Sequence, residues 1–429
     1  MVAPVSEDIV TNGVHNIGPA SHAPDIGDGN EQDLNVLRTE LAAAAHYLQS
    51  RIEQDGLEDS IVQAEAAGDA LGATNKLADA FIKALDAPEG PNGSGSLEGC
   101  MQELLVWVKK QCAMNDDLVD KICNGLCEGV SNGELRLRCM ALLYNFVGEH
   151  HHAKRFTLLA ATIALAAKVC LVPTIVDTVL PKLESFMRHW QTGIPEKRRM
   201  YKVCYEALKS ADMAEQAFTF NVKQLGLYNG ATEEELKTAE EPTIDVIVQA
   251  VRLPKLYRFD TLLELDAVKR FEKLDGDFKR LHELISIFVR DDLAAFAEFK
   301  SKNEEFLQKY EIDVAVAEDK MRLLTFASLG IDSPDLTYDM IASALQIPQD
   351  QVEEWVIRAI SSGLVDGKIN QLKSSVAIYR STQRMFTREE WLPLSERINI
   401  WKENIGELLT SLRETRQAST AAAVEAFSG

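Results

Sequence analysis

Three consecutive histidines in "EHHHAKR", residues 149–155, have side chains whose chemistry includes metal binding and proton transfer. Adjacent side chains diverge by about 100° around a helix, so three in a row do not converge on one ion. A metalloprotease arrangement built on His150 and His152 would need a serine and an aspartate further on, where Ala160 and Ile163 stand. The sequence therefore favours a structural or surface role for these histidines.

Seven cysteines are scattered over the first half of the chain, at positions 100, 112, 123, 127, 139, 170 and 204. Cys123 and Cys127 lie four residues apart and can share one face of a helix. Structural zinc sites use tighter paired spacings, which this sequence lacks. The pattern favours free thiols, most of them buried as small apolar side chains.

The segment "GLVDGK", residues 363–368, is partly similar to a phosphate-binding loop. It has three residues between its glycines, fewer than that loop requires, and Ile369 replaces the hydroxyl residue. The chain has no Gly-x-Ser-x-Gly motif, and its acidic pairs at 116–117 and 291–292 stand at expected helix starts, where carboxylates favour the helix dipole. We therefore expect no enzymatic activity, no bound metal and no cofactor.

Charge limits what the chain can bind. Its 429 residues carry a formal net charge of −21, and residues 1–99 hold 17 acidic against 4 basic side chains. Such a field repels phosphate, so nucleic-acid binding would need a strong basic patch. Only short basic runs occur, at 154–155 and 197–199, and such runs are usually solvated helix ends. With no uncharged apolar stretch of about 18 residues, we expect no membrane span and a cytosolic or nuclear location.

The sequence pattern divides the chain into segments. Residues 1–30 lack apolar periodicity and are predicted to form a disordered tail. Residues 31–99 are predicted to be an acidic helical region that ends in a flexible linker, "APEGPNGSGSLEG". Residues 100–317 have nearly unbroken helical periodicity. This pattern predicts a mostly α fold of stacked helical hairpins, either a right-angled bundle or an α-solenoid.

Residues 318–380 are predicted to form a winged helix. Two short helices follow "KMRLLTFASL", and beyond Gly363 the apolar period drops to two on both sides of "QLKSS", which predicts a β-hairpin. Thr337 can cap the first helix, and Gly363 closes the second, where a left-handed residue is favoured. The apolar helix positions predict the core, which consists of Ile341, Leu345, Val352, Trp355, Val356 and Ile360.

The second helix of this module lacks the side chains that read DNA. Its early exposed positions are Asp350, Gln351, Glu353 and Glu354, whereas contacts in the major groove favour Arg, Lys, Asn or Gln. Carboxylates at a helix N-terminus suit the helix dipole but not neighbouring phosphates. The sequence therefore disfavours direct nucleic-acid binding. The edge strand of the wing can instead be paired by a neighbouring protein chain.

Residues 387–416 are predicted to form a C-terminal helix with a narrow apolar seam. The seam residues recur at alternating intervals of three and four, as heptad a and d positions do, and are Trp391, Leu394, Ile398, Trp401, Ile405, Leu408 and Leu412. Thr387 and Glu390 can form a capping box, although Pro393 can shift the start later. The seam can pack on another protein or on the chain's own winged helix, and the sequence leaves both open. Residues 417–429 are predicted to be a frayed tail.

Several phrases resemble the PCI family, the scaffold class shared by the proteasome lid, the COP9 signalosome and translation initiation factor 3. "KMRLLTFASL" and "DMIASALQIPQDQVEEWVIRAISSGLVDGKINQ" resemble the PCI winged helix. More narrowly, "ELRLRCMALLYN", "VLPKLESFMRHW", "LYRFDTLLELDAVKRFE" and "WLPLSERINIWKENI" resemble, in this order, the m-subunit family of eukaryotic translation initiation factor 3. The resemblance runs from about residue 100 to residue 412, and residues 1–99 have no part in it.

The resemblance implies a non-catalytic, cytoplasmic scaffold subunit that assembles with other PCI and MPN subunits of this factor on the 40S ribosomal subunit. In that family winged helices stack edge to edge and C-terminal helices gather in a bundle. This implies two partner interfaces, the heptad seam and a wing interface of Lys368, Ile369, Val376 and Ile378. A scaffold subunit of the COP9 signalosome or proteasome lid is the alternative, and a nucleic-acid-binding PCI protein is the second alternative.

Overall fold

The computed structural model describes residues 31–53, 55–87, 95–111, 116–148, 151–384 and 388–428. Helices account for most of these residues, and a small three-stranded sheet lies near the C-terminal end. The chain divides into two compact units after Leu227. The mostly α prediction, with a winged helix and a C-terminal helix, is confirmed. Within the described ranges, no helix is both long and apolar enough to cross a membrane. The predicted disordered tail, residues 1–30, lies outside those ranges.

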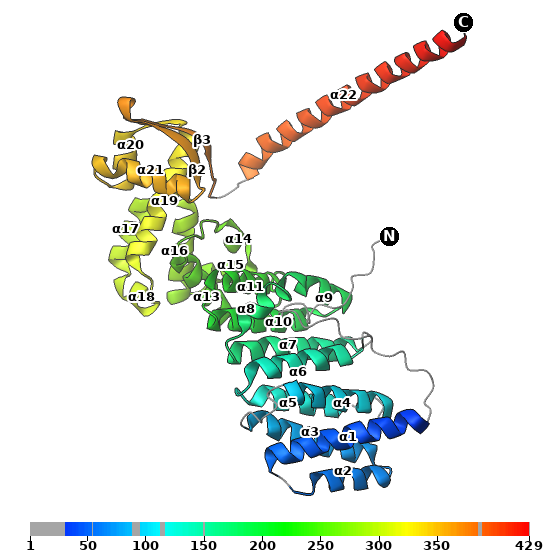
Figure 1. Cartoon of the computed structure of the whole chain (residues 1–429). Coiled ribbons are helices and arrows are strands. Elements are labelled where there is room, and N and C mark those ends of the chain that lie inside the picture. Colours follow the sequence, from blue (N-terminus) through cyan, green and yellow to red (C-terminus); the bar gives the residue numbers. More distant parts are fainter. Residues whose placement is uncertain are drawn as a thin grey trace. The chain divides into compact units, whose positions relative to one another are not determined.

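The first unit is a stack of helices in which neighbours in sequence pack as hairpins, such as α2 on α3, α6 on α7 and α10 on α11 (Figure 1). The helices are α1 (Glu31–Ile52), α2 (Leu57–Ala66), α3 (Ala70–Asp86), α4 (Gly95–Gln111), α5 (Asp116–Glu128), α6 (Gly133–Phe146), α7 (His152–Lys168), α8 (Val172–Val176), η1 (Leu180–Lys182), α9 (Leu183–His189), α10 (Ile194–Ser210) and α11 (Ala214–Gly226). Short connections between antiparallel neighbours give the stacked arrangement that the helical periodicity predicts.

One apolar core extends through the first seven helices, from Leu41 to Leu165. It corrects the predicted boundary at residue 99, because α1 and α3 pack directly on α4 and share this core. The acidic composition of the front region marks a charged surface and not a separate unit, since charged side chains stay exposed while the apolar face is buried. The predicted linker is also shorter than expected, because α4 begins at Gly95, and residues 88–94 lie outside the described ranges.

Arg136 is a fully buried base that ties three parts of this unit together. Its guanidinium donates to the carbonyl oxygens of Gly125 (2.9 Å), Leu126 (3.0 Å) and Ser131 (2.7 Å), and to the Asp86 carboxylate (2.6 Å). Hydrogen bonding from Ser131, together with the charge of Arg136, lowers the pKa of Asp86. The C-terminal ends of α3 and α5 are thereby fixed to α6, because a buried charge is tolerated only when it is paired.

The second unit continues the helices and then changes to the winged helix and a final long helix. Its elements are α12 (Glu233–Thr238), α13 (Glu240–Arg252), α14 (Asp260–Glu264), α15 (Asp266–Lys273), α16 (Asp277–Arg290), α17 (Leu293–Lys302), α18 (Glu304–Lys309), α19 (Val314–Asp332), β1 (Asp335–Thr337), α20 (Tyr338–Leu345), η2 (Gln349–Gln351), α21 (Val352–Ser361), β2 (Val365–Asn370), η3 (Gln371–Lys373), β3 (Ser375–Ser381) and α22 (Arg388–Ser428). The α19 helix packs against α13, α17, α20 and α21, so it joins the helices to the winged helix.

The sheet of the winged helix has the order β1-β3-β2, with both pairings antiparallel. The predicted hairpin is confirmed as β2 and β3. The β1 strand was missed, because its three residues are too few to produce an alternating pattern. An irregularity in the β2 register falls between Asp366 and Gly367, and a Cβ on Gly367 would lie 2.7 Å from the Ala377 carbonyl oxygen. Glycine is required there because the two backbones approach so closely.

The C-terminal helix α22 is longer than the sequence predicted. It extends to Ser428, whereas an end at Arg416 and a frayed tail over 417–429 were expected. The helix continues past Arg416 because "QASTAAAVEAFS" is rich in alanine, the strongest helix former, and contains neither Gly nor Pro. The helix already begins at Arg388, so Pro393 does not shift its start. Thr387, half of the predicted capping box, lies outside the described ranges.

Candidate protein-interaction site

The predicted core residues of the winged helix lie together between its helices and the sheet. Ile341, Leu345, Val352, Trp355 and Val356 are buried in one cluster, and Ile360 packs at its margin, partly exposed. Leu336 of β1 and Val365 of β2 complete the cluster from the sheet side. The apolar stripe of α21 is therefore used inside the module and is not available to a partner.

Two local signals set the start of α20 and the end of α21 at the residues that the sequence predicts. The Thr337 side chain accepts a hydrogen bond from the Met340 backbone N–H (3.4 Å) at the start of α20. Gly363 follows α21 with a φ of 73°, a left-handed conformation that costs glycine little. These turns set the directions of α20, α21 and the hairpin, which position the surface of the wing.

The predicted wing interface divides into an inner and an outer part. Val376 and Ile378 are buried, at 1% and 6% exposure, because β3 is the middle strand and these side chains face the core. The prediction that Val376 and Ile378 belong to a partner interface is therefore wrong, because both are core residues. Lys368 and Ile369 lie on β2, which is an edge of the sheet, and Lys368 is exposed. The accessible part of the predicted interface is therefore β2.

A shallow groove lies between the outer face of α21 and the wing. Its apolar lining is Ile357, Ile369, Leu372 and Tyr379, and the ammonium group of Lys368 lies 5.7 Å from the centre of the Tyr379 ring. Ile357 and Tyr379 are 55% and 66% exposed, which is high for large apolar side chains. Ile357, Leu372 and Tyr379 were not predicted from the sequence, because all three lie outside the apolar stripes that indicated the core.

One acidic side chain, Glu353, lines this groove. The Glu353 carboxylate accepts hydrogen bonds from the Tyr338 hydroxyl (2.8 Å) and the Gln371 side chain (2.9 Å). Burial and the neighbouring Glu353 raise the pKa of Tyr338 to about 12. Asp350 and Glu354 are exposed beside it. The face that reads DNA in other winged helices is therefore acidic in this chain, which opposes phosphate binding.

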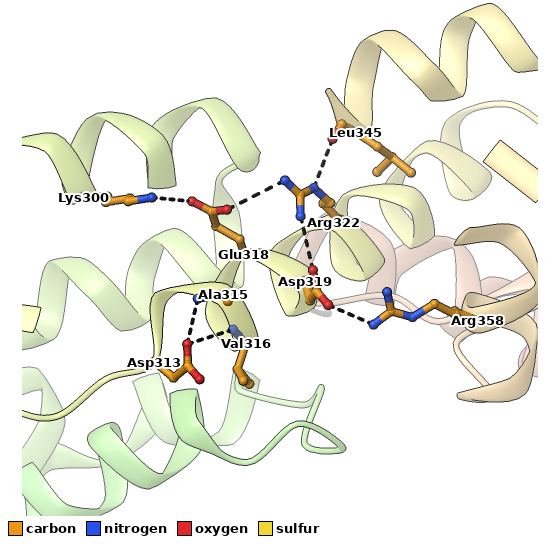
Figure 2. Close-up of polar contacts among 9 residues, drawn as sticks. All are labelled: Lys300, Asp313, Ala315, Val316, Glu318, Asp319, Arg322, Leu345 and Arg358. Carbon is orange, nitrogen blue, oxygen red and sulfur yellow. Dashed lines mark hydrogen bonds and ion pairs between the residues drawn. The ribbon is translucent and has the colours of Figure 1, made fainter. Parts of the chain in front are cut away.

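A chain of ion pairs attaches the winged helix to α19 (Figure 2). Glu318 lies 2.8 Å from Lys300 of α17 and 3.7 Å from Arg322. Asp319 then accepts from Arg322 (3.2 Å) and from Arg358 of α21 (2.9 Å). Acidic side chains of α19 thus alternate with basic ones of α17, α19 and α21, and the pairs link α21 to the helices that precede it.

Both arginines of this network also flank the indole ring of Trp355. The guanidinium carbon of Arg358 lies 4.2 Å from the centre of the ring, and that of Arg322 lies 5.5 Å from it. Arg322 further donates to the Leu345 carbonyl oxygen at the end of α20 (3.3 Å). Trp355 thus joins the apolar core to the charged network, through packing and cation–π attraction.

Lys320 is a buried base at the junction of α19 and α13. Its Nζ donates to the carbonyl oxygens of Ala250 (2.5 Å) and Leu253 (2.7 Å) at the end of α13, and lies 4.7 Å from the centre of the Phe259 ring. Burial lowers the pKa of Lys320 to about 7. The two carbonyl oxygens and the Phe259 ring are the partners of this amine in an otherwise apolar site.

Arg384 fixes the chain just before α22. It donates to the carbonyl oxygens of Leu324 (3.0 Å) and Asp291 (2.5 Å), and to the Thr325 hydroxyl (3.3 Å). Burial lowers the pKa of Arg384 to about 10, so the side chain remains charged at neutral pH. The segment that leads to the C-terminal helix is therefore anchored on α19.

The seven seam residues of α22 are all exposed in the structure. Their exposure ranges from 36% to 65% for Trp391, Leu394, Ile398, Trp401, Ile405, Leu408 and Leu412. Large apolar side chains in such number are rarely left in water, and a contiguous patch of this kind marks an interaction site.

Of the residues that suggested metal or thiol chemistry, Cys123 and Cys127 lie together with a hydrogen bond between their thiols, whereas the described histidines form no metal site. His150 lies outside the described ranges, and the His152 ring packs at right angles to that of His189, with centres 5.5 Å apart. Cys123 is buried and Cys127 half-buried, both as free thiols. Among the described residues, no group of three or more His, Cys, Asp or Glu side chains is placed to hold a metal ion.

The proteins to which this chain is similar agree with this architecture. Residues 300–380, from α17 to β3, match the family described as the PCI domain. The human protein named eukaryotic translation initiation factor 3 subunit M is 30% identical over 298 residues, which cover 69% of this chain and 77% of that protein. This chain belongs to the subunit M family of eukaryotic translation initiation factor 3. The family resemblance expected from the sequence phrases is thereby confirmed.

Distant members of the subunit M family cover more of the chain. The Dictyostelium discoideum protein of the same name is 28% identical over 326 residues, 75% of this chain and 79% of that protein. The Phaeosphaeria nodorum protein is 27% identical over 389 residues, 87% of this chain and 86% of that protein. The similarity to subunit M therefore extends well beyond the PCI match.

Proposed function

We propose that this chain is a non-catalytic scaffold subunit of the translation initiation factor 3 complex. It assembles with other PCI and MPN subunits through β2 of its winged helix and through α22. The complex supports initiation on the 40S ribosomal subunit in the cytoplasm. The proposal rests on the subunit M relatives together with one structural observation, the exposed seam of α22.

The seam supports a role in assembly because it is energetically unfavourable in an isolated chain. Each large side chain gains about 1.5–3 kcal/mol on full burial, so covering seven of them with partner helices is strongly favourable. A single seam of a and d positions matches the geometry of helix bundles and coiled coils.

The open edge of β2 supports a second contact. Strands at the edge of a sheet have unpaired N–H and C=O groups that a neighbouring strand can pair, and the groove beside β2 supplies apolar surface for its side chains. This contact needs no basic surface, which agrees with the acidic residues around α21.

Two other functions are less well supported. A subunit of the COP9 signalosome or proteasome lid would share the fold, but the relatives bear the name of an initiation factor subunit. A nucleic-acid-binding winged helix would need bases where Asp350, Glu353 and Glu354 stand.

The test is a tagged full-length chain with Ile398→Asp and Trp401→Asp, purified from its own cells. We expect this variant to stay helical and soluble by circular dichroism but to lose the other subunits in native mass spectrometry and to stop cosedimenting with 40S particles. The matched control is Glu396→Gln with Glu403→Gln, two substitutions on the opposite face of α22. Unchanged assembly of the seam variant would contradict the proposal.

A further inference from the structure

Charged side chains on α22 are sorted by face. Between Trp391 and Leu412 the charged residues are two bases, Arg397 and Lys402, and three acids, Glu396, Glu403 and Glu407, all exposed. At about 100° per residue, the two bases flank the seam on opposite sides, at g and e positions. The three acids fall on the outer face. Between Trp391 and Leu412, both charges at the e and g positions are therefore positive.

We propose that the α22 seam selects partner helices whose own flanking positions are acidic, and that the same two bases keep two copies of this chain from pairing through α22. The proposal deepens the proposed assembly function and rests on it. Charges at e and g positions set partner choice in helix pairs because they meet across the interface at its margins.

The two bases disfavour self-pairing in either orientation. In a parallel pair, Arg397 of one copy faces Lys402 of the other, and the two-fold symmetry repeats this repulsion on the second side. In an antiparallel pair, like positions meet, so Arg397 approaches its own copy in one register and Lys402 approaches its own copy in another. An acidic partner replaces every one of these repulsions by an attraction.

The apolar face of α22 also exceeds what one partner helix would cover. Leu409 occupies an e position, beside the seam residues Ile405 and Leu412, and is 49% exposed. Trp401 is 65% exposed and is bulky for a two-stranded core. A wider face suits a bundle in which more than one acidic-flanked helix contacts α22.

The test uses the full chain and two synthetic helical peptides with the same Ile and Leu heptads, one with Glu and the other with Lys at every e and g position. We expect the Glu peptide to bind about tenfold more tightly than the Lys peptide at low salt, with the preference shrinking as salt is raised. Arg397→Glu with Lys402→Glu should reverse the preference. Glu396→Lys with Glu403→Lys, a reversal on the outer face, should preserve it. Equal binding of both peptides, or binding of neither, overturns the proposal.

Self-association gives a second readout. The unmodified chain should sediment as a monomer, whereas Arg397→Glu alone should promote dimers, because it converts the parallel contact with Lys402 into an attraction. A dimer of the unmodified chain that Ile398→Asp with Trp401→Asp dissolves would overturn the proposal. If the seam variant fails to assemble while the double flank reversal assembles normally and binds both peptides equally, the charge selection is wrong and the scaffold function stands. If the seam variant assembles normally, the scaffold function itself fails.

Discussion

Helices α21 and α22 have equally regular apolar stripes, yet one stripe is buried and the other is exposed. In α21 the residues Val352, Trp355 and Val356 pack against α19, α20 and the sheet. In α22 the residues Ile398, Trp401 and Ile405 are at least half exposed. Periodicity therefore identifies an apolar face but not what covers it. A covered apolar face stabilises the fold of the chain itself. An exposed apolar face instead contributes favourable free energy when a partner buries it.

Trp355→Ala, in the buried stripe of α21, should cause the largest loss of stability. Removing a buried indole leaves a cavity and should lower the free energy of unfolding of the second unit by about 3–5 kcal/mol. The measurement is urea denaturation of the purified chain, followed by circular dichroism. A loss below about 1 kcal/mol would show that the α21 stripe is not a core.

The buried Lys320 should have the second-largest effect, because it makes the free energy of unfolding depend on pH. Its pKa is lowered to about 7 in the folded chain, against about 10.4 when unfolded, so the unfolded chain binds one more proton between these values. The free energy of unfolding should therefore rise with pH in this window, by up to about 1.4 kcal/mol per pH unit, and be flat in this respect below about pH 7.

Lys320→Met supplies the control for this measurement, because it removes the titrating group. The slope of stability between about pH 7 and about pH 9 should be smaller in the variant than in the unmodified chain. Identical slopes would mean that Lys320 keeps its proton in the folded protein.

Asp319→Asn should have a smaller effect. It weakens the pairs to Arg322 and Arg358 that hold α21 on α19 (Figure 2). Because the Asp319 side chain is 40% exposed and screened by water, we expect a loss of about 0.5–1 kcal/mol, reduced by added salt. Asp350→Asn, an exposed carboxylate on the same module, is the matched control. A salt-independent loss would point to packing and not to the ion pairs.

Ile405→Ala should have the smallest effect on the isolated chain. The side chain is 57% exposed, so its truncation should change the free energy of unfolding by less than about 0.5 kcal/mol. The same change should weaken assembly with partner subunits, measured by competitive copurification. A large loss of stability without partners would show that the α22 seam is already buried within the chain.

The sequence predicted most of the winged helix but not all of its surface. Thr337 and Gly363 have local roles that follow from residue type, so the helix ends could be predicted. Val376 and Ile378 were assigned to the interface because the family resemblance implies a wing contact, and the sequence does not indicate which face of the wing is buried. The short β1, which makes β3 central, depends on pairing with residues about forty positions away and has no local signal of its own.

The helical class, the winged helix, the heptad seam and the family could all be predicted from the sequence, because periodicity and turn chemistry are properties of neighbouring residues. The tertiary structure added that the acidic front shares a core with α4, that Arg136 and Lys320 are buried against distant carbonyl groups, and that β2 is an edge strand. These features depend on contacts between segments far apart in the chain. Burial is decided by what packs on a face, and composition does not record it.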